Sequence, residues 1–331
     1  MANTANQKLR LLYVLEYIKN ESDENHPVTT AEIIEFLEKQ GIGAERRSIY
    51  DSIETLKDYG YDIISVGTPK KGYCLVSRDF EPAEIFLLTG AVQSAGFISR
   101  KKTEQLVSKL EKLLSREEAK EISRQVFIYD RNKASNEEIF YSIDKAARAI
   151  KQNKKISLKY LKRRFSGGKI GFEERELTVS PYAVLWANDH YYLVGNIAKY
   201  DNLIHLRIDR MKGVEILDEN RRHFSEVSEY KNVFDIADYS KKSFNMFGGE
   251  LCDVTLRCAP RLLDQVVDRF GENVFITGED EDGFTFSTRV LVSEGLISWV
   301  LQYGDSVEVR SPLSLREMIT ERIEKLRKLY F

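Results

Sequence analysis

The spacing of hydrophobic residues changes markedly near residue 155 of this 331-residue chain. Before that point apolar side chains recur every three or four residues, as on one face of a helix. After it they alternate with polar side chains, as in a half-buried strand. A domain usually contains about 100–200 residues, so the length favours two or three domains. The sequence therefore predicts an α+β multidomain protein.

Residues 1–80 contain three short helical patterns followed by two short strands. The second helical pattern opens with Thr29 and Glu32 at the spacing of a capping box. In the third, Ile49 and Ile53 share one face. The two strands, YDIISV and YCLV, are joined by the basic turn GTPKKG. Three helices and a two-stranded wing are the order of a winged helix-turn-helix, whose third helix enters the major groove.

In that arrangement the start of the third helix and the tip of the wing would contact duplex DNA. The candidate DNA-binding residues are Thr29, Thr30, Arg46, Arg47, Ser48, Tyr50, Lys70 and Lys71. The alternative is a three-helix bundle with an ordinary solvated face. Charge does not exclude it, because residues 1–80 hold ten basic and thirteen acidic residues, a net charge of 10 − 13 = −3.

Two basic features stand out in the middle of the chain. Residues 148–175 hold ten basic and two acidic residues, a net charge of 10 − 2 = +8. This stretch, with Lys159, indicates either a phosphate-bearing ligand or a solvated hairpin tip, for which residues 162–169 would form a plain loop. In the predicted strand IHLRIDRM, His205 and Arg207 share one face and Arg210 follows just beyond. Such a group suits an anionic ligand, and the alternative is a surface ion-pair patch with Asp209.

Other function classes find little support. The formal charge of −2 excludes binding nucleic acid over the whole surface, so any such contact is local. Four histidines and three cysteines show neither H-E-x-x-H spacing nor a C-x-x-C pair, so no metal is expected. The sequence has no P-loop, G-x-G-x-x-G or G-x-S-x-G motif, so we expect no cofactor and no catalytic residues. Without a membrane span or a signal core, we expect a soluble, cytoplasmic protein.

Several segments together resemble a known family of bacterial regulators. AERRSIYDSIETLKDYGYDI and the GYCL wing are similar to the winged helix-turn-helix of DeoR-like regulators. SPYAVLWANDHYYLVGNI followed by HLRIDRM resembles the WYL domain, an Sm-like β-barrel. ISWVLQYGDSVEVRSPLSLREMI resembles the extension that follows WYL domains. The chain differs from the usual pattern in two places: Tyr191 begins the naming triplet where Trp is usual, and Gly43-Ala44 stand where a Ser or Thr is common before the recognition helix.

The resemblance implies a homodimeric transcriptional regulator that senses a nucleotide or a single-stranded nucleic acid in its WYL domain. The positions that match the family's proposed ligand-binding residues are Tyr182, His205, Arg207 and Arg210. The last 80 residues also alternate strands and helices as a ferredoxin-like sandwich does. The predicted parts are a winged helix-turn-helix at 1–80, a helical linker and possible dimer seam at 81–137, a WYL domain at 138–225, a linker with a glycine hinge at 226–250, and an extension at 251–331.

Three hypotheses follow. The first is a nucleoid-associated regulator that binds a duplex operator through Arg46 and Arg47 and is switched by an anionic ligand near Arg207. The second is an accessory protein that binds single-stranded nucleic acid directly through residues 148–175. The third is an enzyme acting on nucleotides, for which His205 would be the base. The resemblance favours the first.

Overall fold

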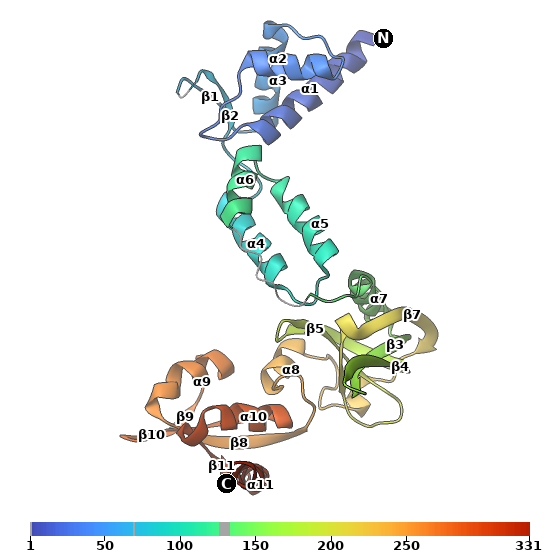
Figure 1. Cartoon of the computed structure of the whole chain (residues 1–331), viewed down its shortest axis with the longest axis vertical. Helices are drawn as coiled ribbons and strands as arrows, with labels where there is room; N and C mark the ends of the chain where they lie inside the picture. The colour runs from blue at the N-terminus through green and yellow to red at the C-terminus, as the bar shows by residue number, and fades with distance from the viewer. Residues whose placement is uncertain (1, 69, 126–132) are drawn as a thin grey trace. The chain divides into compact units, whose positions relative to one another are not determined.

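A computed structural model describes residues 2–68, 70–125 and 133–331, with side chains from Gln7 onward (Figure 1). The chain divides into two compact units, unit 1 (Met1–Ser135) and unit 2 (Asn136–Phe331). Each unit is considered by itself. The predicted helical linker at 81–137 includes residues 126–132, which lie outside the described residues.

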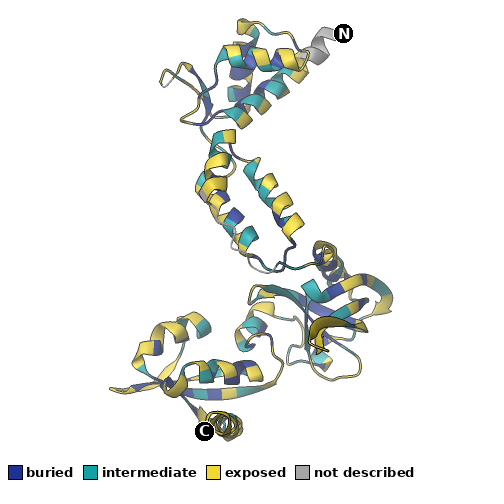
Figure 2. Cartoon of the chain, in the orientation of Figure 1, coloured by how far each residue is buried: buried dark blue, intermediate teal, exposed yellow. Residues whose placement is uncertain are grey.

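Unit 1 begins with the three helices and the hairpin that the sequence predicts. They are α1 (Ala2–Glu21), α2 (Thr30–Lys39), α3 (Arg46–Tyr59), β1 (Ile63–Val66) and β2 (Gly72–Leu75). Their shared core contains one apolar face of each helix, and its fully buried side chains include Val14, Ile18, Ile33, Leu37 and Ile49 (Figure 2). Helical spacing of apolar residues thus produced the expected packing.

Three more helices complete unit 1, namely α4 (Pro82–Ser94), α5 (Arg100–Glu111) and α6 (Arg116–Gln125). They have a small core of their own, formed by Ile85, Leu114 and Ile122.

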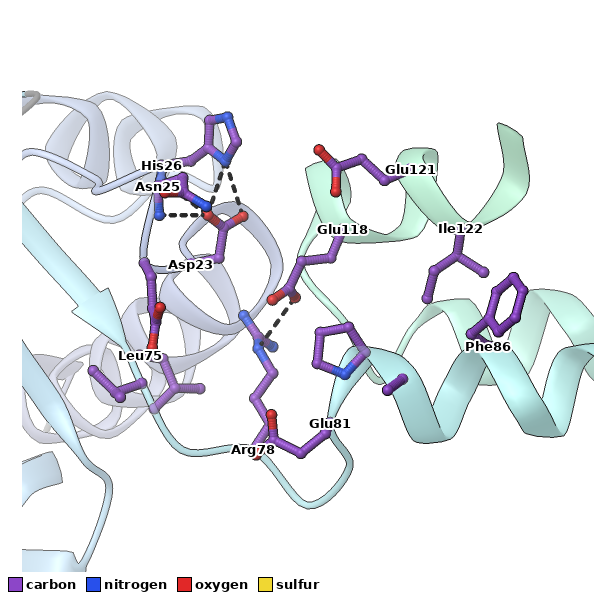
Figure 3. A pocket seen from close by; sticks show the side chains of 14 residues that line it. Asp23, Asn25, His26, Leu75, Arg78, Glu81, Phe86, Glu118, Glu121 and Ile122 are labelled. Carbon is purple, nitrogen blue, oxygen red and sulfur yellow. Dashed lines mark hydrogen bonds and ion pairs between the residues drawn. The ribbon is translucent and has the colours of Figure 1, made fainter. Parts of the chain in front are cut away.

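Polar contacts tie the start of α6 to the end of α1. The Ser115 hydroxyl donates to the buried Asp23 carboxylate at 2.6 Å. Arg78 donates to the carbonyl oxygens of Lys19 and Ser22 and lies 3.5 Å from Glu118. Of these residues, Asp23, Arg78 and Glu118 border a cavity of about 510 Å³ (Figure 3). Residues before and after position 80 therefore belong to one packed body.

Unit 2 begins with a helix against an antiparallel sheet. Its elements are α7 (Ile139–Gln152), β3 (Lys154–Ser166), β4 (Lys169–Ala187), β5 (His190–Asn196), β6 (Ile204–Arg207), the 3₁₀ turn η1 (Ile208–Arg210) and β7 (Met211–Asn220). The strand order is β6-β5-β4-β3-β7. Among the described residues β6 and β7 are the two edges, so these pairings do not close a barrel.

Two local predictions in this sheet were wrong. The strand expected through IHLRIDRM ends at Arg207, because η1 interrupts it before β7 begins. The segment from 162 to 169, expected to be a loop, is mostly strand, and only Gly167 and Gly168 form the turn. Both glycines have positive φ, 59° and 75°, as a two-residue hairpin turn requires.

The rest of unit 2 is a second antiparallel sheet with helices. Its elements are η2 (Phe224–Glu226), α8 (Ile236–Lys242), β8 (Glu250–Cys258), η3 (Pro260–Leu262), α9 (Leu263–Phe270), β9 (Ile276–Asp280), β10 (Gly283–Val292), α10 (Glu294–Gln302), η4 (Gly304–Ser306), β11 (Val307–Ser311) and α11 (Leu313–Tyr330). The strand order is β11-β8-β10-β9, and Phe286 is fully buried at its centre.

The segment between α8 and β8 packs tightly against this second sheet. Arg269 donates to the carbonyl oxygen of Ser243 at 2.8 Å, and its guanidinium lies 3.9 Å from the centre of the Phe244 ring. An added Cβ at Gly249 would overlap the backbone carbonyl of Val292. Gly249 is therefore a close-packing position, which differs from the hinge expected from the sequence.

Candidate functional site

The start of α3 carries the first group of candidate residues. Glu45 is the N-cap residue, and a capping box joins it to Ser48, whose hydroxyl accepts from the Glu45 backbone N–H at 3.1 Å. At the other end Gly60, with φ of 116°, closes the helix. Ser48 therefore stabilises the helix end, so the cap that Gly43-Ala44 lacked is supplied by other residues.

The exposed face of this helix presents two arginines. Burial of Ile49 and Ile53 against α1 and α2 leaves Arg46, Arg47 and Tyr50 exposed. Within the described residues no hydrogen bond or ion pair involves either arginine side chain. Their guanidinium groups can therefore contact an external anion without first breaking a bond within the protein.

The wing tip and the start of α2 form one polar cluster. Thr29 caps α2, and Glu32 accepts from the Thr29 backbone N–H at 2.7 Å, which completes the predicted capping box. The Lys70 ammonium lies 2.7 Å from the same carboxylate. Burial alone would raise the pKa of Glu32, but the hydrogen bonds from Lys70 and Thr29 outweigh it and lower the pKa. Lys71 is exposed beside this cluster, and Thr30 begins the helix half-buried.

Backbone contacts fix the wing to the same place. Val28 and Tyr73 exchange two backbone hydrogen bonds, of 2.9 and 2.8 Å. Gly72 lies so close that an added Cβ would be 2.6 Å from the Val28 carbonyl oxygen. The wing is thus held at the N-terminus of α2.

The second group of candidates lies on the five-stranded sheet. The Arg207 guanidinium makes two bonds to the Asp209 carboxylate, of 3.0 and 2.6 Å. Its backbone N–H donates to the Tyr160 hydroxyl at 3.3 Å. This is the ion pair that the sequence left open as the alternative. Arg210 is half-buried and forms no hydrogen bond or ion pair within the described residues, and Lys159 is exposed on β3.

His205 has a different environment from Arg207. Its Nε2 is hydrogen-bonded to the Tyr239 hydroxyl at 2.6 Å, and the two rings stack 5.7 Å apart. Burial lowers the pKa of His205 to about 4. His205 is therefore neutral at pH 7, and the positive charge on this part of the sheet belongs to Arg207 and Arg210.

Tyr182 is buried under an aromatic cover formed by Phe224, Phe234 and Tyr239. Its ring lies 6.1 Å from both Phe224 and Phe234, and the latter lies 5.3 Å from Tyr239. Burial raises the pKa of Tyr182 to about 12. The structure thus groups Tyr182 with His205 beneath residues 224–239, whereas Arg207 and Arg210 form a separate charged group.

The low pKa of His205 predicts a pH-dependent stability of unit 2. An ordinary histidine titrates near pH 6.5, so between about pH 6.5 and 4 the unfolded chain binds more protons than the folded chain. Stability therefore falls as the pH falls through this window, and we expect His205 to account for about 2 kcal/mol between pH 7 and pH 5. Urea unfolding followed by tryptophan fluorescence reports unit 2 alone, since the two tryptophans are Trp186 and Trp299.

The matched variants are His205→Gln and His223→Gln. The first should remove most of this pH dependence, and the second, at an exposed histidine, should retain it. An equal slope in both variants would show that other groups cause the effect.

Nearby carboxylates offset part of the positive charge of the basic stretch at 148–175. Five of its ten basic side chains lie within 4 Å of a carboxylate. The partners are Asp144, Glu173, Asp218 and Glu219. Three of these carboxylates lie outside the stretch, so counting charges along the sequence missed them.

Sequence analysis also missed neighbours of the charged group. Tyr192 is the cross-strand partner of Arg207. Burial raises the pKa of Tyr192, and burial together with Arg207 and Arg210 lowers the pKa of His190. The alternation of β5 could have indicated Tyr192, but nothing in the sequence gives the register between β5 and β6.

The described residues contain no cluster of three or more metal-ligating side chains. Nor, within those residues, is any helix both long and apolar enough to cross a membrane.

Two solved structures resemble the chain weakly. Proteasome accessory factor B/C (PafBC) of Arthrobacter aurescens is 17% identical with a TM-score of 0.28; the alignment covers 98% of this chain and 49% of that one, so this chain spans about half its length. A CRISPR Cas-related protein is 14% identical with a TM-score of 0.35, and the alignment covers 99% of this chain and 86% of that one.

Sequence comparison is more informative. A protein of Bacillus subtilis (strain 168) named "Uncharacterized HTH-type transcriptional regulator YobV" is 23% identical over 313 residues, which are 92% of this chain and 94% of that protein. Residues 142–216 match the WYL domain family, and residues 250–327 match the WCX domain family. Residues 142–216 and 250–327 are therefore WYL and WCX domains, and together with the similarity to an HTH-type regulator they support a WYL-domain transcriptional regulator.

Proposed function

We propose that this regulator binds duplex DNA through residues 1–80, which act as a winged helix-turn-helix. The observation that carries the proposal is the start of α3, where Arg46 and Arg47 are exposed and free of partners among the described residues. The helix order and the attached wing support it, because a recognition helix reads bases with its first turns while flanking residues hold the backbone. Thr29, Lys70 and Lys71 lie together at the wing and would contact phosphates.

We further propose that an anionic ligand, a nucleotide or a single-stranded nucleic acid, binds at Arg207, Arg210 and Lys159. Tyr182 and His205 would then support the sheet from beneath the aromatic cover. Guanidinium groups bind phosphate through paired N–H donors, and Arg210 has these donors free within the described structure. A ligand that pairs with Arg207 would compete with Asp209.

The order of strands and helices in unit 2 also supports the proposal of a ligand-sensing regulator. The order β-α-β-β-α-β over residues 250–311 is that of a ferredoxin-like sandwich. We also infer that the five-stranded sheet corresponds to the Sm-like module of WYL domains, and that the regulator is a homodimer on a two-fold symmetric operator.

Arg210→Ala should remove the ligand response and leave duplex binding without ligand unchanged. The measurement is anisotropy of a labelled duplex from the chain's own upstream region, titrated with ATP, GTP and a short oligo-dT strand. Arg210 is the chosen position because Arg207→Ala would leave the Asp209 carboxylate unpaired and risk unfolding. Arg289→Ala, on the second sheet, is the control.

If one of these probes shifts duplex affinity in the native protein and equally in Arg210→Ala, the ligand binds elsewhere. The competing hypothesis, direct binding of single strands through residues 148–175, predicts tight oligo-dT binding after residues 1–135 are removed. The pairing of five of its ten basic side chains with carboxylates disfavours that hypothesis.

A further inference from the structure

Strands β3 and β4 of unit 2 extend together beyond their neighbours in the five-stranded sheet. β7 pairs with β3 only as far as Tyr160, and β5 pairs with β4 only from Ser180 onward. Residues 161–174, here called the hairpin arm, are thus paired only with each other among the described residues. Both outer edges of the arm have free backbone donors and acceptors.

The register gives the hairpin arm two different faces. Phe165 lies opposite Ile170, and Arg163 lies opposite Phe172. Because side chains alternate along a strand, these four residues share one face and Lys162 and Arg164 lie on the other. The exposed fractions of Phe165, Ile170 and Phe172 are 75%, 74% and 60%.

Large apolar side chains that are this exposed mark a surface for binding a partner. The tip is also strongly basic. Residues 162–172 contain four basic residues, Lys162, Arg163, Arg164 and Lys169, and no acidic ones.

Acidic residues and exposed apolar residues lie at the free edge of the second sheet. β9 is the last strand in the order β11-β8-β10-β9, so one of its edges is unpaired. Phe275 and Ile276 at its start are exposed. The end of β9 and the turn that follows it, residues 279–282, contain four acidic residues in succession. Asp280 is bonded to Arg257 at 2.6 Å. Glu279, Glu281 and Asp282 are exposed.

We propose that the hairpin arm of one copy of this chain docks on the β9 edge of a second copy. Each site provides what the other lacks: basic against acidic side chains, an apolar patch against Phe275 and Ile276, and open strand edges on both. No hydrogen bond or ion pair joins the two sites within the described residues of one chain. Under two-fold symmetry the contact occurs twice, because each copy gives an arm and accepts one.

Nucleic acid is the less suitable partner for the hairpin arm. A single-strand binding surface interleaves aromatic rings with cations on one face, so that bases stack while phosphates are neutralised. In the arm only Arg163 shares the face of Phe165 and Phe172, whereas Lys162, Arg164 and Lys169 lie on the opposite face. The inference rests on the homodimer of the proposed function and names its contact, but it does not depend on DNA or ligand binding, because the association is measured without either.

Reciprocal charge reversal of the full chain tests this contact. The arm variant is Lys162→Glu, Arg163→Glu and Lys169→Glu. The turn variant is Glu279→Lys, Glu281→Lys and Asp282→Lys, which spares Asp280. The control, Lys101→Glu, Lys109→Glu and Lys112→Glu on and just after α5, makes the same change in net charge as the arm variant. Sedimentation equilibrium measures the dimer dissociation constant of each.

We expect the native protein and the control to dimerise, more weakly at high salt. Each variant alone should dissociate at least about 30-fold more readily, because like charges would then face each other. An equimolar mixture of the arm and turn variants should form a heterodimer as tightly as the native homodimer, since both contacts are again complementary. That recovery also shows that both variants are folded.

A monomeric native protein, or a mixture that stays monomeric, would overturn the proposal. So would a dimer that survives in both variants, which would place the seam elsewhere, for example at the exposed Leu87 of α4. If the arm variant keeps the dimer but loses binding to oligo-dT, the hairpin arm is a nucleic-acid surface and the proposal is wrong.

Discussion

Replacing Arg46 and Arg47 together by alanine should weaken binding to the specific duplex by at least about 30-fold. Each well-placed arginine contact to a base contributes about 1–3 kcal/mol of discrimination, so two contribute at least about 2 kcal/mol. Because neither side chain has a partner among the described residues, their removal leaves no buried charge unpaired. The helix itself keeps its Glu45–Ser48 cap.

Fluorescence anisotropy at two salt concentrations measures this effect. Binding to a duplex from the chain's own upstream region is compared with binding to a scrambled duplex of equal length. A base-reading role lowers specific affinity more than non-specific affinity, whereas a phosphate-binding role lowers both and flattens the salt dependence. Arg100→Ala with Lys101→Ala removes two exposed charges from α5 and serves as the control. Unchanged specific binding in the Arg46 and Arg47 variant would exclude α3 as the recognition helix.

Gly249→Ala should destabilise unit 2 by about 3 kcal/mol or more. Inserting one carbon into a well-packed site typically costs about 1–3 kcal/mol when side chains can adjust. Here the added Cβ would overlap the backbone carbonyl of Val292, so a side-chain rotation cannot relieve it and β10 or β8 must shift. The expected cost is therefore at the upper end of that range or above it.

The neighbouring glycine provides the matched control. A Cβ at Gly248 would lie 3.7 Å from the carbonyl oxygen of Leu203, which is an ordinary contact. Urea unfolding followed by the fluorescence of Trp186 and Trp299 should show a lower midpoint for Gly249→Ala and little change for Gly248→Ala. Equal midpoints would mean that the segment is loosely packed and that the glycine pair acts as the hinge expected from the sequence.

Local patterns predicted the elements well where one segment determines its own structure. The capping box of Thr29 and Glu32 and the buried face of α3 were each confirmed. These features depend on residues three or four positions apart, and such residues are neighbours on a helix. The same reasoning gave the α+β architecture and its change near residue 155.

Contacts between distant segments could not be predicted in this way. Alternation placed His205 and Arg207 on one face, but only the fold shows that Tyr239 covers His205 and leaves it neutral. Likewise Lys70 is 38 positions from Glu32, and only the fold brings their side chains together. Charge counted along the sequence therefore did not show that the Glu32 carboxylate pairs with Lys70 at the wing.

The bond between Ser115 and Asp23 also bears on how the proposed DNA-binding part could be transplanted into another protein. A chimera that ends at residue 80 would remove Ser115 from a buried carboxylate and Glu118 from Arg78. Such a fusion carries unsatisfied polar groups at its new surface and should express poorly. A fusion made after Ser135 keeps both contacts, so a designer who needs a modular DNA-binding unit should take the first 135 residues as one piece.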